Sequence, residues 1–384
     1  MGVKNVVILG STGSIGINAL NVIERLKGKF KVVGLTAYNN VDLLHKQIKK
    51  FSPRYVAVGV HGMGYLRKHL SSKSAKIFNV DSEIDYIVSR PEVDIVLIAM
   101  RGSGALSPFL SAIRCGKTVA PANKEALVIA GDIIMAEAKK YKATIIPIDS
   151  EQSAIFQCLE GKNIKELKKI YLTASGGPLL DIPKEKFDQL SVKEILRHPR
   201  WKMGKKITVD SATLMNKGFE VIEAKRLFGV EVNQINVLIH PQALIHSMVE
   251  FRDGSILAQL GATDMRLPIQ YALTYPHRYK SGVASMDFSR FKKLTFAQVD
   301  QQKFPALGLC FYAAEKSGTL PCVLNAADEE AVEAFLTGHL SFSRIYKVVE
   351  KVVLKHTRIQ KPALDQILAA DQWAREEAQK IIFN

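Results

Sequence analysis

The chain has 384 residues, of which 47% are hydrophobic, and a formal net charge of +16. This length accommodates two or three globular domains, and no apolar run approaches the roughly 18 residues that a membrane-spanning helix needs. The excess of Lys and Arg predicts an anionic partner, such as a phosphorylated small molecule, a nucleotide or a nucleic acid.

Several features lie outside any motif. The chain leads almost at once into a buried-looking strand, so we expect no leader peptide and a cytoplasmic protein. The four cysteines form no CxxC pair and are expected to be packing residues. Paired lysines are expected on the solvated surface, at Lys49–Lys50, Lys139–Lys140, Lys168–Lys169 and Lys205–Lys206.

The first recognisable pattern is a strand, a glycine turn and a helix. The run NVVILG is followed by Gly10, Gly13 and Gly16 and by the apolar-periodic stretch INALNVIERL. Glycines let the backbone approach a pyrophosphate, and the N-terminus of the following helix provides free N–H groups. The spacing is GxxGxxG rather than the commoner GxGxxG, but its place after the first strand favours a dinucleotide site over a merely structural turn.

Strand-like runs alternate with helical patterns along this part of the chain, at residues 31–37, 55–60, 93–100, 117–122 and 143–148. Such alternation predicts a parallel, doubly wound sheet. After the second strand, where NAD enzymes usually carry an acidic residue for the ribose 2′-hydroxyl, this chain has Tyr38, Asn39 and Asn40. The missing carboxylate favours NADP, although no Lys or Arg stands there either.

Polar residues also follow a later strand. Asn123, Lys124 and Glu125 come just past a strand end, where α/β sheets bind ligands. Lys124 is a candidate for contacting a substrate oxygen. The alternative is a surface lysine in the first turn of the next helix.

Asp149 and Glu151 follow the apolar run ATIIPI and lie two residues apart, which puts both carboxylates on one side of the chain. Close anions repel unless a cation or a shared proton lies between them, so one interpretation is a Mg²⁺ or Mn²⁺ site. The other is a helix N-terminus, with Asp149 or Ser150 as the cap and Glu151 in the first turn. This segment alone does not decide between them.

Two central segments have features of ligand-binding loops. The residues SGGP, 175–178, form either a backbone nest for a phosphate or a plain turn. Residues 196–206 combine His198, Trp201 and Met203 with several basic side chains, which is typical of a mobile lid over an anionic ligand. The alternative is a surface loop pinned by a buried tryptophan.

Residues 209–228 are expected to be helical from about Ser211, with a weak point at Gly218 where the helix bends or begins later. One helix face would carry acidic and amide side chains with a lysine beside them: Asn216, Glu220, Glu223 and Lys217. Glu220 is our candidate for a third oxygen ligand beside the two carboxylates of the DSE segment. Taken as an isolated feature, a solvated helix face is the simpler interpretation.

The remainder of the chain is expected to be structural. His240 and His246 are each interpreted as hydrogen-bonded core or dimer-face histidines. Beyond about residue 300 the pattern becomes helical, with apolar side chains at helical spacing at Ile345, Val348, Val349, Val352 and Val353. A small helical bundle with its own core is indicated.

Six segments, in this order, resemble the 1-deoxy-D-xylulose 5-phosphate reductoisomerase family: GSTGSIG, PANKEA, IDSEQSAIFQ, SGGP, RHPRWKMGKKITVDSATLMNKGFEVIEA and IHPQALIHSMVEFRDGS. The resemblance extends from the start of the chain to beyond residue 275. It implies an NADPH-dependent, homodimeric enzyme of the non-mevalonate isoprenoid pathway with an α/β fold. The implied domains are an NADPH-binding, Rossmann-like doubly wound sheet at 1–149, a central α/β catalytic, metal-binding and dimerisation domain at 150–275, a linker at 276–300 and a helical bundle at 301–384.

The resemblance also implies site residues at the matching positions. The metal ligands, for Mg²⁺ or Mn²⁺ with Co²⁺ as an alternative, would be Asp149, Glu151 and Glu220. Substrate binding and catalysis would fall to Lys124, Ser150, Glu151, Ser175, His198, Ser211, Asn216, Lys217 and Glu220. The cofactor would meet Thr12, Gly13, Ser14, Ile15, Tyr38, Asn39, Asn40, Asn123, Glu125 and Gly204, with Trp201 and Met203 on the lid. Many members have a Gly and a basic residue where this chain has Tyr38 and Asn39, which weakens any inference about recognition of the 2′-phosphate.

The implied reaction converts 1-deoxy-D-xylulose 5-phosphate to 2-C-methyl-D-erythritol 4-phosphate. The metal would chelate the substrate's ketone and neighbouring hydroxyl oxygens, retro-aldol and aldol steps would rearrange the carbon skeleton, and NADPH would reduce the resulting aldehyde. The terminal phosphate would be bound by Ser175, Ser211, Asn216 and Lys217. His198 and Trp201 would close the site and exclude water.

Two other functions fit parts of the sequence. A dehydrogenase of the semialdehyde or homoserine type would use the glycine turn but would not need three converging carboxylates. A nucleic-acid-binding module would use the positive charge, but it predicts a clustered basic face with interleaved aromatics, whereas the lysines are dispersed and aromatic residues make up only 8%. We therefore expect neither a nucleic acid nor a membrane as a partner.

Overall fold

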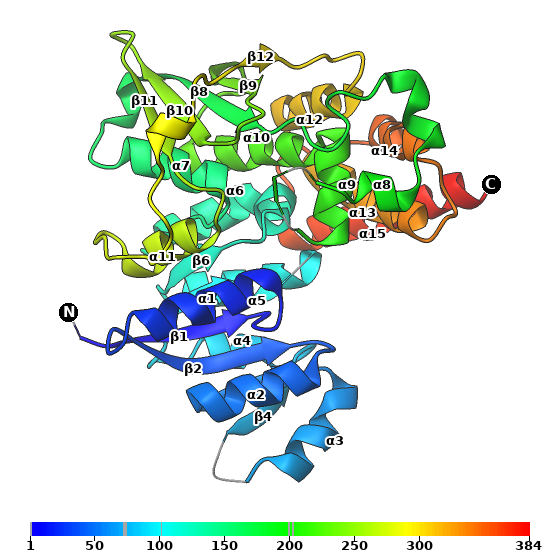
Figure 1. Ribbon diagram of the computed structural model, residues 1–384. Helices are drawn as coiled ribbons and strands as arrows, with labels where there is room; N and C mark the ends of the chain where they lie inside the picture. Colours follow the sequence, from blue (N-terminus) through cyan, green and yellow to red (C-terminus); the bar gives the residue numbers. More distant parts are fainter. Residues whose placement is uncertain (1, 72–74, 101, 199, 202) are drawn as a thin grey trace. The chain divides into compact units, whose positions relative to one another are not determined.

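The computed structural model describes residues 2–384 except 72–74, 101, 199 and 202 (Figure 1). The chain splits into two compact units. The first comprises Met1–Ala126, Ile133–Ser153 and Asp264–Ala284, and the second comprises Leu127–Asp132, Ala154–Thr263 and Ser285–Asn384. The predicted α/β fold class is confirmed, while the predicted domain limits stay a prediction.

The first unit is built on a parallel sheet with the strand order β4-β3-β2-β1-β5-β6-β7. Its strands are β1 Lys4–Leu9, β2 Phe30–Ala37, β3 Tyr55–Val58, β4 Lys76–Asn79, β5 Ile95–Ile98, β6 Thr118–Pro121 and β7 Thr144–Ile145. The helices that alternate with them are α1 Ser14–Arg25, α2 Val41–Phe51, α3 Val60–His69, α4 Ile84–Val88, α5 Leu106–Arg114 and α6 Glu125–Lys140; α11, Arg266–Thr274, also belongs to this unit. Strand β1 lies between β2 and β5, so the strand order reverses there, and ligands of such sheets bind beyond the carboxyl ends of the strands at this point.

The central strands of this sheet are buried along most of their length. Val6, Val7, Ile8 and Leu9 of β1 have no exposed surface, as expected for a parallel sheet covered on both faces. All five strand-like runs named from the sequence contain strands, although the last is reduced to the two residues of β7. Strand β4 was not predicted, because its short sequence KIFN is only partly buried and lacks the continuous apolar pattern of the inner strands.

The second unit contains a mixed sheet with the order β11-β10-β8-β9-β12. Its strands are β8 Leu167–Ala174, β9 Ile235–Ile239, β10 Ile245–Phe251, β11 Ile256–Leu260 and β12 Ala297–Gln298. Strands β8 and β9 are parallel, and the other neighbours are antiparallel.

The helices of the second unit include α8 Val192–Ile195, α9 Lys205–Thr213, α10 Met215–Phe228, α12 Pro305–Lys316, α13 Leu320–Leu336, α14 Phe342–Lys355 and α15 Leu364–Phe383. Helix α7, Ser150–Leu159, begins in the first unit and continues into this one. The apolar stripe predicted near the C-terminus is buried along α14, as expected for a helical region with its own core. Most of the buried apolar residues of α9, α10 and α12–α14 join the β8 and β9 side chains in one core cluster.

The helix expected over 209–228 is in fact two helices. Helix α9 begins earlier, at Lys205, and the chain breaks at Leu214, whose φ of 62° is left-handed, before α10 starts. The break was expected at Gly218, but that residue lies inside α10. A Cβ there would collide with the side chain of Cys310 on α12, so the glycine permits close packing of two helices rather than a bend.

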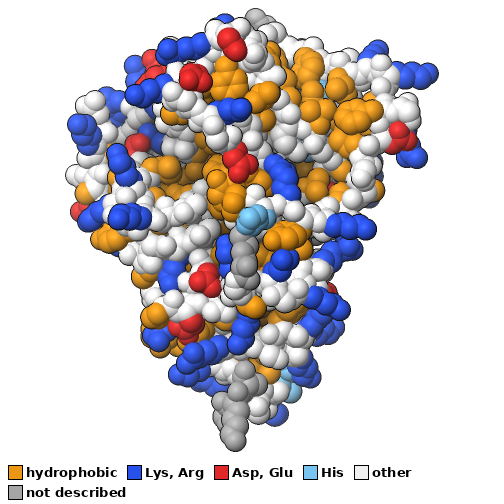
Figure 2. All heavy atoms as spheres, turned by 90° about the vertical axis from the view of Figure 1, so that its left-hand side faces the viewer, with side chains coloured by type: hydrophobic (Ala, Val, Ile, Leu, Met, Phe, Trp, Pro, Cys, Tyr) orange, Lys and Arg blue, Asp and Glu red, His pale blue; other side chains and the backbone are white. Residues whose placement is uncertain are grey.

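The expectations for membrane-spanning helices, paired lysines and cysteines can be compared with the structure. Among the described residues, no helix combines the length and the apolar character that crossing a membrane requires. Figure 2 shows one face, on which Lys and Arg side chains are scattered rather than gathered. Lys206 is an exception to the solvated lysine pairs, because its ammonium group pairs with buried carboxylates. Cys158, Cys310 and Cys322 are buried as expected, but Cys115 is exposed.

Candidate active site

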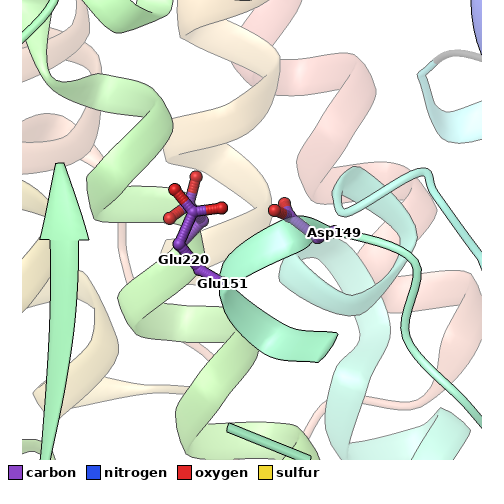
Figure 3. Close-up of side chains that lie close together, drawn as sticks. All are labelled: Asp149, Glu151 and Glu220. Atoms are coloured by element: carbon purple, nitrogen blue, oxygen red, sulfur yellow. The ribbon is translucent and has the colours of Figure 1, made fainter. Parts of the chain in front are cut away.

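Three carboxylates from separate parts of the sequence meet at one place (Figure 3). Asp149 immediately precedes α7, Glu151 lies in its first turn, and Glu220 lies on α10. Each offers a carboxylate oxygen, and these oxygens lie within 4.8 Å of one another. Glu220 is 1% exposed, so the solvated-face interpretation of this helix is wrong.

The helix-N-terminus interpretation of the DSE segment is confirmed, while the metal site stays a prediction. Helix α7 starts at Ser150, and the Ser153 N–H donates to the carbonyl of Asp149 at 2.8 Å, so the segment is a helix N-terminus. The same start aims Asp149 and Glu151 toward Glu220. The positive end of the helix dipole partly offsets the repulsion between two carboxylates placed there.

Lysines partly neutralise the acidic cluster. Lys124 pairs with Asp149, and Lys217 pairs with Glu220. Both lysines are buried, which rules out the surface interpretation of Lys124. Asn216 donates from Nδ2 to Glu220 Oε1 at 2.6 Å. The two ammonium groups therefore offset part of the negative charge that gathers here.

The donor set matches a hard divalent metal. Mg²⁺ and Mn²⁺ prefer carboxylate oxygens, and Mg²⁺ ligands at about 2.1 Å stand about 3–4 Å from one another in octahedral geometry. The oxygens of the cluster, all within 4.8 Å of one another, lie close to such spacing. Ser150 donates from Oγ to Glu151 Oε2 at 2.5 Å, which orients that carboxylate.

A histidine organises the neighbouring polar group. His198 Nε2 lies 3.3 Å from Ser175 Oγ and 3.1 Å from Ser211 Oγ. Its Nδ1 accepts the backbone N–H groups of Arg200 and Trp201, at 3.2 and 2.9 Å. Because Nδ1 is an acceptor, the neutral ring carries its proton on Nε2 and donates toward the serines. Burial lowers the pKa of His198 from 6.5 to about 4, so the ring is neutral at pH 7.

Two glycines bring the serines together. Gly176 and Gly177, with φ of 88° and 68°, follow Ser175 at the end of β8. A Cβ on Gly177 would collide with the carbonyl of Ser211 on α9. The glycine pair therefore lets the β8 end approach α9, whichever interpretation of SGGP applies.

At the glycine turn, some residues allow close backbone packing and others are accessible to a ligand. Gly10 has a φ of 82°, and a Cβ there would lie 2.7 Å from the carbonyl oxygen of Ala99; a Cβ on Gly16 would collide with Gly10 and Ser11. Gly13 and Ser14, in contrast, are exposed, whereas Thr12 and Ile15 are partly buried. Helix α1 has no side-chain cap at Gly13, so N–H groups of its first turn remain available to an anion.

Of the remaining cofactor candidates, two form hydrogen bonds that hold local structure, and the others are exposed or partly exposed. Asn123 donates to the Met100 and Gly102 carbonyls at 2.8 and 3.3 Å and accepts from Ala126 N, so it fixes the loop between β5 and α5. Asn40 caps α2, accepting from Leu43 N at 3.2 Å. Tyr38 is 56% exposed and Asn39 is exposed. Glu125 begins α6 and Gly204 directly precedes α9, and both are partly exposed.

The predicted lid, 196–206, contains Pro199 and Lys202, which lie outside the described residues. Within the described part, Trp201 and Met203 are partly exposed, and the Trp201 ring lies 6.3 Å from that of His246. His240 is a hydrogen-bonded core histidine, with Nδ1 2.9 Å from the Thr295 carbonyl. Sequence reasoning placed Lys206 on the solvated surface and did not single out Asp210, although their spacing of four on a helix is a recognisable signal for an ion pair.

Comparison with known proteins places this geometry in a family. The family described as 1-deoxy-D-xylulose 5-phosphate reductoisomerase matches residues 6–131, its C-terminal domain matches 145–228, and a further DXP reductoisomerase C-terminal domain matches 260–377. The chain belongs to the 1-deoxy-D-xylulose 5-phosphate reductoisomerase family. The three matches together span both units of the fold, including every carboxylate of the acidic cluster.

Relatives within this reductoisomerase family match almost end to end. A protein of this name from Thermoanaerobacter pseudethanolicus is 49% identical over 378 residues, covering 98% of this chain and 99% of the relative. One from Bacteroides fragilis is 46% identical over 380 residues, covering 99% and 98%.

Solved structures of reductoisomerases have the same fold. A crystal structure of DOX-P reductoisomerase in complex with NADPH, fosmidomycin and magnesium is 38% identical, covers 99% of this chain and 98% of its own, and has a TM-score of 0.96. The enzyme from Zymomonas mobilis in complex with NADPH is 37% identical, with 99% coverage of both chains and a TM-score of 0.92.

Proposed function

We propose that this chain catalyses the NADPH- and divalent-metal-dependent isomerisation and reduction of 1-deoxy-D-xylulose 5-phosphate to 2-C-methyl-D-erythritol 4-phosphate. The observation that carries this proposal is the convergence of Asp149, Glu151 and Glu220 in a chain of the reductoisomerase family. A simple dehydrogenase would not need three carboxylates at one point.

Asp149, Glu151 and Glu220 would hold the metal, Mg²⁺ or Mn²⁺. Bound there, the ion supplies Lewis-acid polarisation of the substrate's ketone and adjacent hydroxyl oxygens. Lys124 and Lys217, paired with Asp149 and Glu220, help to orient these ligands. Ser150 restrains Glu151 in the same way through its hydrogen bond.

Ser175, Ser211, Asn216 and Lys217 would bind the substrate's phosphate. Two hydroxyls, an amide and an ammonium form a set of donors suited to a phosphate dianion. His198 links the two serines, and its neutral ring avoids placing a fixed charge in the site. Binding energy gained at the phosphate end can then hold the reacting end in position.

NADPH would bind at the turn between β1 and α1. Thr12, Gly13, Ser14 and Ile15 contribute an uncapped helix N-terminus, which suits a pyrophosphate. The cofactor supplies the hydride for the final reduction. The other cofactor candidates, at Tyr38, Asn39, Asn40, Asn123, Glu125 and Gly204, would shape its surroundings, and the lack of a carboxylate after β2 favours NADPH over NADH.

We also infer that the protein is cytoplasmic and forms a homodimer. The segment 196–206 would act as the lid of the site. A dimer is supported by β11, an edge strand of its sheet whose Ile256 and Leu257 are 52% and 40% exposed. Exposed apolar side chains on a sheet edge favour pairing with another chain.

The test is an assay of NADPH oxidation by the purified chain, with product identification by mass spectrometry and NMR. We expect oxidation only with 1-deoxy-D-xylulose 5-phosphate present, and 2-C-methyl-D-erythritol 4-phosphate as the product. A folded protein that oxidises a semialdehyde or homoserine-type substrate instead would replace this proposal with the dehydrogenase alternative.

A further inference from the structure

A second buried charge cluster lies outside the acidic site. Lys206, in the first turn of α9, places its Nζ 2.7 Å from Asp210 Oδ2 and 2.7 Å from Asp328 Oδ2. Asp210 lies one turn further along α9, whereas Asp328 lies on α13 in the helical C-terminal region. The three residues therefore connect two helices that are far apart in the sequence.

The cluster is shielded from water. The Asp210 side chain is 3% exposed, that of Asp328 is 0% exposed and that of Lys206 is 22% exposed. The ammonium of Lys206 also lies 4.8 Å from the centre of the Phe219 ring, on α10. Burial raises the pKa of Asp328, and the adjacent Lys206 opposes this rise. Two carboxyl groups and an aromatic ring thus contact one ammonium.

This cluster lies on the helix that carries Ser211, one of the proposed phosphate-binding residues. Helix α9 starts directly after Gly204, and Ser211, next to Asp210, meets His198 at 3.1 Å. At its other end, the Asp210 carbonyl accepts from Thr213 Oγ, which in turn accepts from the N–H of Met215 at the start of α10. The orientation of α9 therefore affects both Ser211 and the start of the helix that carries Asn216 and Lys217.

The role of this cluster that we consider is to orient the helices it joins rather than to stabilise the fold. Replacing a buried ion pair by apolar side chains of similar volume is often neutral or stabilising, so burial of these charges is weak support for a purely stabilising role. Paired charges, in contrast, accept only a narrow range of geometries. A helix that must hold a hydroxyl at a fixed point benefits from that restriction.

We propose that Lys206 is a positioning residue, which clamps α9 to α13 through Asp210 and Asp328 and so holds Ser211 in place for the substrate's phosphate. This inference rests on the proposed function, because it assigns Ser211 to substrate binding. It gives the C-terminal helical region a specific part in the site, through Asp328.

The experiment compares K206M with K206R and with K225M as a matched control. Lys225 also joins helices through a partly buried ammonium, which donates to the Ala314 carbonyl and Ser317 Oγ at 2.7 and 2.9 Å, but it lies in the last turn of α10, whereas Ser211 lies on α9. Substrate KM, kcat and the thermal unfolding midpoint are measured for each variant. We expect K206M to raise substrate KM about tenfold with kcat changed less, K206R to stay within about threefold of wild type, and K225M to leave KM within about twofold.

A readout independent of turnover follows substrate binding by fluorescence. The chain has two tryptophans. The W373F background leaves Trp201, whose backbone N–H donates to His198. Titration with 1-deoxy-D-xylulose 5-phosphate in the absence of NADPH should give about tenfold weaker binding for K206M/W373F than for W373F.

Loss of stability is separated from loss of positioning by K206M/D328N, which removes one carboxylate charge together with the ammonium. We expect its unfolding midpoint to return toward wild type while substrate KM stays raised. The clamp is rejected if KM recovers with stability, if K206M leaves KM unchanged, or if K225M raises it equally. Failure of the wild-type chain to turn over the substrate would reject the proposed function instead, before any variant is compared.

Discussion

The acidic cluster and the glycine turn both come from sequence motifs, but they depend on opposite properties of their residues. At the cluster, side chains from distant segments converge and partly neutralise one another. At the turn, the important feature is missing side chains: Gly10 and Gly16 allow backbone contacts that a Cβ would block, while Gly13 remains accessible. Isosteric substitutions in the cluster should therefore reduce turnover without unfolding the protein. At the turn, the effect on stability and on NADPH binding should depend on which glycine is changed.

The largest effect is expected at Glu151. The change E151Q keeps the side-chain shape and removes one charged oxygen ligand, so turnover should fall at least about a thousandfold, equivalent to about 4 kcal/mol in the barrier. Binding of NADPH, measured by fluorescence titration, should stay within about twofold of wild type. Equal loss of turnover and NADPH binding in a folded variant would contradict the separation of the two sites.

At the turn, G10A and G13A form a matched pair. G10A forces a side chain onto a φ of 82° and against the Ala99 carbonyl, which should cost about 2–4 kcal/mol of folding free energy. G13A, at an exposed residue with a φ of −78°, should retain most of the stability but weaken NADPH binding. Urea unfolding and NADPH titration of both variants test this contrast, which a similar stability loss in each would refute.

A smaller effect is expected at Lys217. K217A removes one donor for the phosphate and the partner of Glu220, so substrate KM should rise about tenfold to a hundredfold, as expected for a charged hydrogen bond worth about 1.5–3 kcal/mol. NADPH affinity should not change. Steady-state kinetics against K225M as control measure this, and an unchanged substrate affinity would leave Lys217 with only a structural role.

The smallest effect concerns pH and His198. The pKa of this residue is about 4 in the folded chain against an ordinary 6.5, so between these values the unfolded chain binds a proton that the folded chain does not. Stability from this group is therefore complete above pH 6.5 and falls as the pH drops toward 4. Unfolding midpoints of wild type and H198Q across this range should converge at low pH, and parallel curves would show that His198 does not titrate in this way.

The sequence was most informative where function depends on local order. The strand, turn and helix at the N-terminus, the Asp149–Glu151 pair and the C-terminal apolar stripe could all be read from spacing, because each is defined within a few turns of chain. Spacing also made Glu220 a candidate third ligand, with a solvated helix face as the alternative, and the family resemblance implied the same partnership.

The remaining features depend on contacts that no local pattern contains. Leu214 is left-handed without a local sequence signal, and Gly218 packs against Cys310 of α12 rather than bending the helix, so the helix boundary was misplaced. Lys206 was assigned to the surface, since nothing near it in the sequence indicates that Asp328 would meet it from α13. The separate packing roles of Asn123 and Gly16 likewise appear only when the loops are placed in three dimensions.

The central claim is that Asp149, Glu151 and Glu220 form one divalent-metal site, and equilibrium binding of Mn²⁺ tests it most directly. Electron paramagnetic resonance counts free Mn²⁺ during titration of the chelator-treated chain. We predict one site in wild type and its loss in E151Q and in E220Q, with the fold of both variants retained by circular dichroism. Equal Mn²⁺ binding by wild type and both variants, or none by wild type, would contradict the account.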